Sequence, residues 1–268
     1  MAIRRPAVAG SFYPDKASEL TEYCAARLQD PSARKTCRAL ILPHAGYIYS
    51  GDTACLTLSQ SELKEHVLLI GPDHFAAGGE FSLYPDGAWQ TPLGDLTVDA
   101  KLTGELADQV PLLMPDPDAH TREHSLEVLL PLLKTVRPSI KIAPLIVSTL
   151  DLAAARTAAE GIARVLAPQK ESVTVVISND MSHYEPDVIT RAKDRFALEA
   201  IVNLDAEALA RSVRTHRITM CGFVPVYMLL VMAAKIGIRK AKLVDYRTSA
   251  DATGDRSRVV GYAGFIFE

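Results

Sequence analysis

Short apolar runs alternate with amphipathic segments along the whole chain, and this rhythm constrains the fold more than any other feature. The runs that read as strands are 38–42, 66–70, 80–84, 141–147, 172–177, 241–246 and 258–267. Helical spacing of apolar residues marks 18–28, 51–59, 99–110, 123–136, 151–166, 190–202, 206–213 and 223–236. The alternation predicts an α/β fold with a mostly parallel or mixed central sheet and helices on both faces.

The chain reads as one domain spanning residues 1–268. No Gly/Ser-rich or Pro-rich tract separates the predicted elements, and the sequence holds no internal repeat. Two prolines lie inside predicted secondary-structure elements and affect their interpretation. Pro131 stands inside the predicted helix 123–136 and argues against its continuity, and Pro144 makes strand 141–147 irregular or places it at an edge.

Composition excludes several classes of protein. The 29 basic and 32 acidic residues give a net charge of −3, which lacks the basic surplus typical of nucleic-acid binding. The longest apolar run, 223–234, is shorter than the roughly 20 residues that a membrane span needs, and Pro225 interrupts it. The first residues lack the apolar core of a signal peptide, and the four cysteines form no Cys-x-x-Cys pair, so we expect a cytoplasmic protein with free thiols.

Polar side chains follow the predicted strands at the point where each strand ends. His44 comes after the strand at 38–42, His74 after 66–70, and Asp180 and His183 after 172–177. Asp251 follows the strand at 241–246 in a predicted loop. Ligands of open α/β sheets bind beyond the carboxyl ends of the strands. We therefore expect these five side chains to converge on one rim of the sheet.

Two or three imidazoles with a carboxylate are a ligand set for a divalent transition metal. Each residue also has a simpler interpretation. A single histidine after a strand is often only hydrogen-bonded to backbone, and Asp180 or Asp251 could instead cap a turn. The recurrence of the pattern in three loops favours the metal site.

The densest polar cluster is residues 120–127 (HTREHSLE). On a helix, His124 and Glu127 would share a face and could act as a base with an orienting carboxylate. Acidic residues at a helix N-terminus are the alternative. We interpret Cys221 as a structural thiol rather than a nucleophile, His66 and His216 as surface residues, and leave His120 unassigned.

Taken in order, several motifs resemble the Memo-like family, whose bacterial and archaeal members are grouped as AmmeMemoRadiSam system protein B. The motifs are residues 5–14 (RPAVAGSFYP), 43–47 (PHAGY) with 50–51, 71–74 (GPDH), 91–94 (TPLG), 123–127 (EHSLE), 178–183 (SNDMSH) and 221–222 (CG). The resemblance covers essentially the whole chain. It implies a fold like that of class III extradiol, LigB-type non-haem iron dioxygenases.

The resemblance also implies roles for particular residues. His44 and His74 match two family histidines that bind metal, with iron or copper proposed, and Asp180 and His183 match an Asp-x-x-His pair in the pocket. Animal relatives use a C-terminal cysteine as a third ligand. This chain has no cysteine after Cys221, so either Asp251 substitutes at 248–251 or the third ligand is missing. Loss of a soft thiolate would favour a harder ion over copper.

Three functions follow as expectations. The first is a dioxygenase-like oxidoreductase, with Fe(II) favoured over Zn or Cu and with His44, His74 and Asp251 (or Asp180) as ligands. Its catalytic candidates are His183, Asp180, His124 and Glu127. The second is a Zn-dependent hydrolase with Glu127 or Asp180 as base. The third is a non-catalytic protein that binds a small molecule or peptide and works with radical-SAM and AMMECR-type protein partners.

Overall fold

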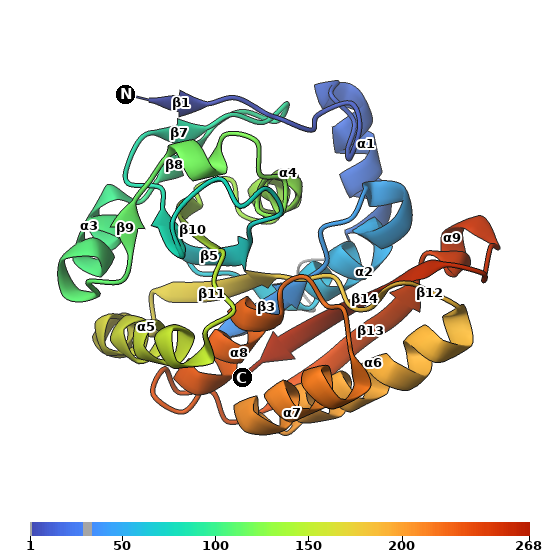
Figure 1. Cartoon of the computed structure of the whole chain (residues 1–268). Helices are drawn as coiled ribbons and strands as arrows, with labels where there is room; N and C mark the ends of the chain where they lie inside the picture. The colour runs from blue at the N-terminus through green and yellow to red at the C-terminus, as the bar shows by residue number, and fades with distance from the viewer. Residues whose placement is uncertain (1, 29–33) are drawn as a thin grey trace.

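A mixed β-sheet runs through the middle of the molecule (Figure 1). The computed structural model describes residues 2–28 and 34–268. Along the sheet the strands follow the order β1 (Ile3–Arg4), β7 (Ala88–Trp89), β8 (Leu96–Val98), β10 (Lys141–Val147), β5 (His66–Pro72), β11 (Val173–Ser178), β3 (Ala39–Leu42), β14 (Val259–Phe267) and β12 (His183–Glu185). Beside this path, β13 (Ala241–Thr248) pairs with β14, and β6 (Phe81–Leu83) joins β10 to β9 (Met114–Pro115). A small separate sheet pairs β2 (Lys35–Thr36) with β4 (Ser61–Glu62).

The middle of the sheet is parallel. Strands β8, β10, β5, β11 and β3 all run in one direction, whereas β14 is antiparallel to β3, β13 and β12. The predicted α/β class with a mostly parallel or mixed sheet is therefore confirmed. Because the carboxyl ends of β5, β11 and β3 lie side by side, the loops that follow these strands meet at one edge.

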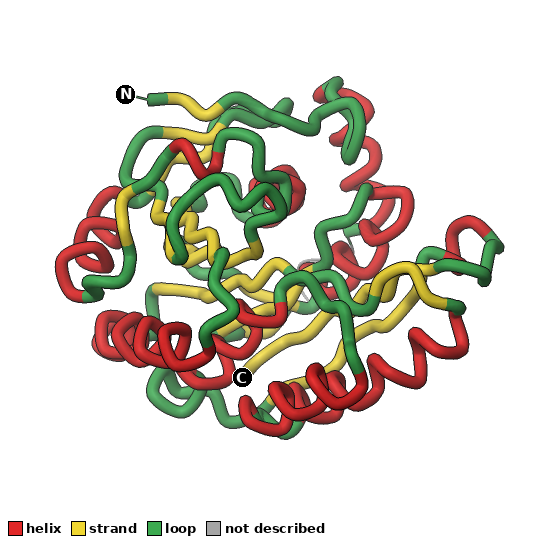
Figure 2. Tube along the Cα trace, in the orientation of Figure 1, coloured by secondary structure: helices red, strands yellow, loops and turns green. Residues whose placement is uncertain are grey.

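Helices cover both faces of the sheet (Figure 2). They are α1 (Ala17–Arg27), α2 (Tyr47–Ser59), α3 (Ala100–Gln109), α4 (Leu130–Val136), α5 (Leu152–Leu166), α6 (Asp187–Val202), α7 (Ala206–His216), α8 (Phe223–Met232) and α9 (Ala250–Thr253). Along β3, Ile41 packs into the core with α3 and α5 to α8, whereas Leu40 and Leu42 pack into the core with α1, α2 and α4. The alternation of side chains along each strand thus supplies both cores.

The predicted helix 123–136 is wrong in its first half. Residues 121–126 form a loop, a short 3₁₀ turn covers Glu127–Leu129, and α4 begins at Leu130. Pro131 lies in the first turn of α4, where a missing N–H costs nothing. Glu127 and His124 therefore do not share a helix face.

Strand β10 is an interior strand despite Pro144, which contradicts an edge position. On one side it pairs with β5 through its whole length, with Pro144 opposite Leu69. On the other side its partner changes from β8, at Lys141 and Ile142, to β6, from Leu145 onward. Pro144 falls at this change of partner, where a strand can lack one donor.

None of the helices in the described ranges has the length and apolar character required to cross a membrane.

Candidate metal centre

A cavity of about 840 Å³ opens where the loops after β3, β5 and β11 meet. Five of the seven predicted site residues line it, together with Cys221: they are His44, His74, His124, Asp180 and His183. The convergence expected from the strand ends is therefore present for four of the five side chains, all but Asp251. The rest of the lining is Phe12, Ala45, Gly46, Tyr49, Tyr184, Thr219, Ser249, Thr253, Asp255, Arg258, Val260 and Tyr262.

His44 is held as a neutral imidazole whose Nε2 faces the Cys221 thiol. Its Nδ1 lies 2.7 Å from Ser178 Oγ, and that hydroxyl donates its only hydrogen to the Ser125 carbonyl, 2.5 Å away. Ser178 must then accept a hydrogen bond from His44 Nδ1–H, which leaves the Nε2 lone pair available. Burial, together with the neighbouring His74 and His124, lowers the pKa of His44 well below its ordinary value.

His74 is fixed in the same tautomer by a buried carboxylate. Glu123, with 0% of its surface exposed, receives His74 Nδ1–H at 2.9 Å on Oε1 and the His74 backbone N–H at 2.6 Å on Oε2. Burial opposes ionisation of Glu123, but the bonds from His74 outweigh it and lower the pKa of Glu123 to about 2. A carboxylate behind a ligating histidine is the usual support of a metal site.

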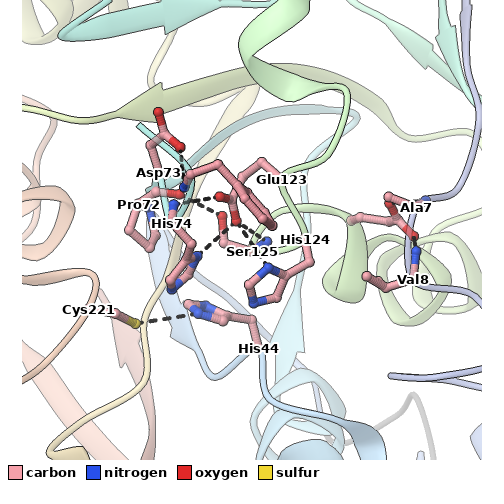
Figure 3. A network of polar contacts seen from close by, with 12 residues as sticks. Ala7, Val8, His44, Pro72, Asp73, His74, Glu123, His124, Ser125 and Cys221 are labelled. Carbon is pink, nitrogen blue, oxygen red and sulfur yellow. Dashed lines mark hydrogen bonds and ion pairs between the residues drawn. The ribbon is translucent and has the colours of Figure 1, made fainter. Parts of the chain in front are cut away.

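Cys221 completes a three-residue donor set that the sequence analysis did not assign. Its Sγ lies 3.4 Å from His44 Nε2, and the donor atoms of His44, His74 and Cys221 all lie within 4.8 Å of one another (Figure 3). Burial and the adjacent Asp180 raise the pKa of the thiol well above its ordinary value in the metal-free protein. A bound cation would act in the opposite direction.

A glycine brings Cys221 to the end of β11. A Cβ at position 222 would lie 2.5 Å from the Ser178 carbonyl oxygen, so only glycine permits this approach. The Gly222 N–H donates to Asn179 Oδ1 at 2.9 Å, just before α8 begins. The Cys-Gly pair ahead of an apolar helix was the signal available in the sequence.

Asp251 does not belong to the cluster, contrary to the expectation. It lies in the short helix α9, exposed, and its Oδ2 accepts hydrogen bonds from Arg191 Nη2 at 3.1 Å and from the Thr248 N–H at 2.8 Å. Its carboxylate caps the end of β13. The carboxylate beside His44 is instead Asp180, whose Oδ2 lies 3.9 Å from His44 Nε2 and whose Oδ1 accepts the His44 N–H.

Glu127 is also absent from the cavity lining. It is fully buried, and its oxygens accept hydrogen bonds from Arg4, Tyr13 and two backbone N–H groups. These bonds tie the N-terminal segment to the loop before α4. The predicted catalytic role of Glu127 has no geometric support, because the carboxylate has neither a free face nor access to the cavity.

His124 and His183 stand beside the donor set. The His124 ring stacks on His74 with centroids 4.5 Å apart, and its Nδ1 lies 3.5 Å from Glu123 Oε1. Burial lowers the pKa of His124. His183 donates Nδ1–H to the Thr219 carbonyl at 2.9 Å, so its Nε2 is left as a proton acceptor.

The remaining histidines lie outside the cavity. His66 Nδ1 pairs with Asp99 at 2.5 Å, and His216 stacks on Phe196 with ring centroids 3.8 Å apart. His120, left unassigned above, is a core residue whose Nε2 binds the Ser82 carbonyl at 3.0 Å. Burial lowers its pKa to about 3.

Comparison with known proteins agrees with the motifs. A family profile described as Memo-like protein matches residues 4–266. This chain belongs to the Memo-like family. Among curated Memo-like relatives, a "MEMO1 family protein" of Aquifex aeolicus (strain VF5) is 40% identical, and the match covers 100% of both chains. One from Ignicoccus hospitalis is 37% identical over 100% of this chain and 99% of its own.

A solved structure supports the fold of this Memo-like chain. The crystal structure of the uncharacterized protein JW3007 from Escherichia coli K12 matches with a TM-score of 0.56, over 85% of this chain and 98% of that one. The two sequences are 12% identical, so the likeness concerns the fold alone.

Proposed function

We propose that the chain is a metal-dependent oxidoreductase whose centre is formed by His44, His74 and Cys221. One observation carries the proposal: the three donor atoms lie within 4.8 Å of one another at a cavity, and each imidazole has its Nδ1 bonded away from the set. Imidazoles that present Nε2, joined by a thiol that can ionise, are the ligands a transition metal takes.

Charge supports the same proposal. The Glu123 carboxylate is buried, and its side-chain partners among the described residues are imidazoles rather than lysine or arginine. A buried anion is costly unless a cation balances it. A divalent ion on His74 Nε2 would lie one imidazole away from Glu123 and would supply the balancing charge.

The donor set suits iron or copper and admits zinc. Imidazole binds all three ions, and a thiolate adds a soft ligand that the substitution by Asp251 would have removed. We retain Fe(II) as the first ion to test, because Asp180 adds a carboxylate beside two histidines and the cavity leaves room for substrate. A redox-active ion bound here would supply electron transfer.

The chain's own residues would handle substrate and protons. His183 presents Nε2 as a proton acceptor, with its ring held by Thr219. Burial raises the pKa of Asp180, so that its carboxyl group can hold and donate a proton as long as no cation is bound beside it. His124 forms the wall next to His74 and orients that ring by stacking.

Elemental analysis of anaerobically purified protein tests the proposal. We expect the wild type to carry iron or copper, and His44→Ala and Cys221→Ser to lose most of it. His216→Ala, on α7 and outside the cavity, is the matched control and should keep the metal. A wild-type protein without transition metal would refute the proposal and favour the non-catalytic binding protein. Zinc alone would favour the hydrolase.

A further inference from the structure

Arg258 is the one lysine or arginine among the described residues that line the cavity. The other arginines on this side of the fold are paired: Arg256 binds Asp187 at 2.8 Å, and Arg191 binds Asp187 and Asp251 at 2.9 and 3.1 Å. No described carboxylate lies within ion-pair distance of the Arg258 guanidinium, which lies over the Tyr184 ring, 5.5 Å from its centroid. Its charge and its donors are therefore available to something that enters the cavity.

Strand pairing places Arg258 at the rim beside the proposed proton acceptor. β12 is antiparallel to β14, with His183 opposite Val260 and Glu185 opposite Val259, and Arg258 directly precedes β14. From there its guanidinium lies over the Tyr184 ring of β12, 5.5 Å from the ring centroid. Tyr184 has φ 62°, a left-handed conformation that is unusual for a tyrosine, and its side chain is exposed. The buried His44 lies deeper in the same cavity.

Apolar and aromatic side chains form much of the remaining wall. Phe12, Tyr49, Val260 and Tyr262 line the cavity, and its volume of about 840 Å³ is that of a small-molecule site. Asp255 also lines it as an ionised carboxylate, because the hydrogen bonds donated by Ser257 Oγ and N–H, at 2.7 and 2.8 Å, lower the pKa of Asp255, so Arg258 is the group in the lining that can bind an anion. The cavity thus offers one free guanidinium, an aromatic wall and a metal-ligating floor.

We propose that the cavity takes a small organic anion, in which a carboxylate or phosphate group is attached to an apolar body of about one ring. Arg258 would bind the oxyanion through its paired N–H groups, and the aromatic wall would hold the body near the donor set. This inference rests on the proposed function, since it names the substrate class of that site.

Calorimetric titration with benzoate, phenyl phosphate and neutral benzamide tests the inference on the protein as purified. We expect the anions to bind the wild type more tightly than benzamide does. Arg258→Gln should weaken anion binding about tenfold or more and leave benzamide unaffected. Arg256→Gln, which removes a neighbouring guanidinium that is paired outside the cavity, should stay near the wild type. The tighter of the two anions identifies the oxyanion.

Two outcomes would overturn the inference. Benzamide could bind as well as both anions, or Arg258→Gln could retain full affinity while His44→Ala loses it, which would mean that the anion binds the metal instead. Metal content is measured on every sample. If the wild type carries no metal, the proposed function fails, but the comparison of Arg258→Gln with Arg256→Gln still decides the anion site.

Discussion

Two buried glutamates four residues apart, Glu123 and Glu127, differ in the side chains that pair with their carboxylates. Both have 0% of their surface exposed. Glu127 binds Arg4 Nη1 at 2.7 Å, and Tyr13 and two backbone N–H groups complete its set of donors. Glu123 also accepts two backbone N–H groups, from His74 and Ser125, but its side-chain hydrogen bond comes from the His74 imidazole, beside the cavity. In Figure 3, Ala7 and Val8, which bind Glu127, lie well apart from the imidazoles.

The difference separates a carboxylate paired with a permanent cation from one whose side-chain partners are imidazoles. Each carboxylate accepts two backbone N–H groups, so the difference lies in the permanent cation, Arg4, which balances the charge of Glu127 and makes its interactions part of the stability of the fold. An imidazole is neutral or charged according to what it binds. Glu123 therefore has no permanent cation among its side-chain partners. Arg4 bridges the two, because its Nη2 also donates to the Glu123 carbonyl oxygen at 2.7 Å.

Glu127→Ala should have the largest effect on stability. It leaves Arg4 buried without its carboxylate, which typically costs about 3–5 kcal/mol of the free energy of unfolding. Denaturant unfolding measures the loss. The molecules that remain folded should still bind metal, since Glu127 is not on the cavity. A loss below about 1 kcal/mol would show that the buried pair has no structural role.

Glu123→Gln should have its main effect on metal binding. The amide keeps the shape but removes the charge behind His74, and loss of such a supporting carboxylate typically weakens metal affinity by about 10–100-fold. Competition with a chelator measures the affinity. Glu127→Gln is the matched control, being the same change four residues away. Equal weakening in both variants would erase the distinction between the two glutamates.

The sequence predicted that strand-end residues converge on one site better than it predicted which residues belong to that site. Alternating strands and helices sufficed to place His44, His74 and Asp180 at one edge, because parallel strand ends must meet there. It could not assign Asp251, since a position after a strand does not reveal that Arg191 already holds the carboxylate.

Cys221 and Glu127 show two further limits. Cys221 reaches the site from the start of α8, a helix that does not follow a site-bearing strand, so strand-end reasoning could not find it. Glu127 was misplaced because apolar spacing continued a helix through residues that form a loop. What these residues bind is decided by tertiary contacts more than 100 positions away along the chain.

Acidic pH should remove the stability that ionised Glu123 contributes, which a neutral residue at this position would not lose. Its pKa is about 2 in the folded protein, below the ordinary 4.5, so it contributes stability that is present above pH 4.5 and is lost as the pH falls from 4.5 towards 2. For metal-free protein, the difference in unfolding free energy between wild type and Glu123→Gln should therefore shrink over this range. Denaturant unfolding at several pH values measures it. A constant difference would mean that Glu123 is not held ionised.

Tyr13→Phe should give the smallest loss of unfolding free energy. It measures how much of the stability that Glu127 contributes comes from the Tyr13 hydroxyl rather than from Arg4. The hydroxyl donates to Glu127 Oε1 at 2.8 Å, and its removal leaves that oxygen with the Val8 N–H while Arg4 still holds the other oxygen. Since one donor to a charged group is lost and the buried cation stays paired, we expect about 1.5 kcal/mol, well below Glu127→Ala. Denaturant unfolding of both variants makes the comparison. If Tyr13→Phe cost as much as Glu127→Ala, the hydroxyl rather than the ion pair would hold the N-terminal segment, and the permanent charge of Arg4 would not be what distinguishes Glu127 from Glu123.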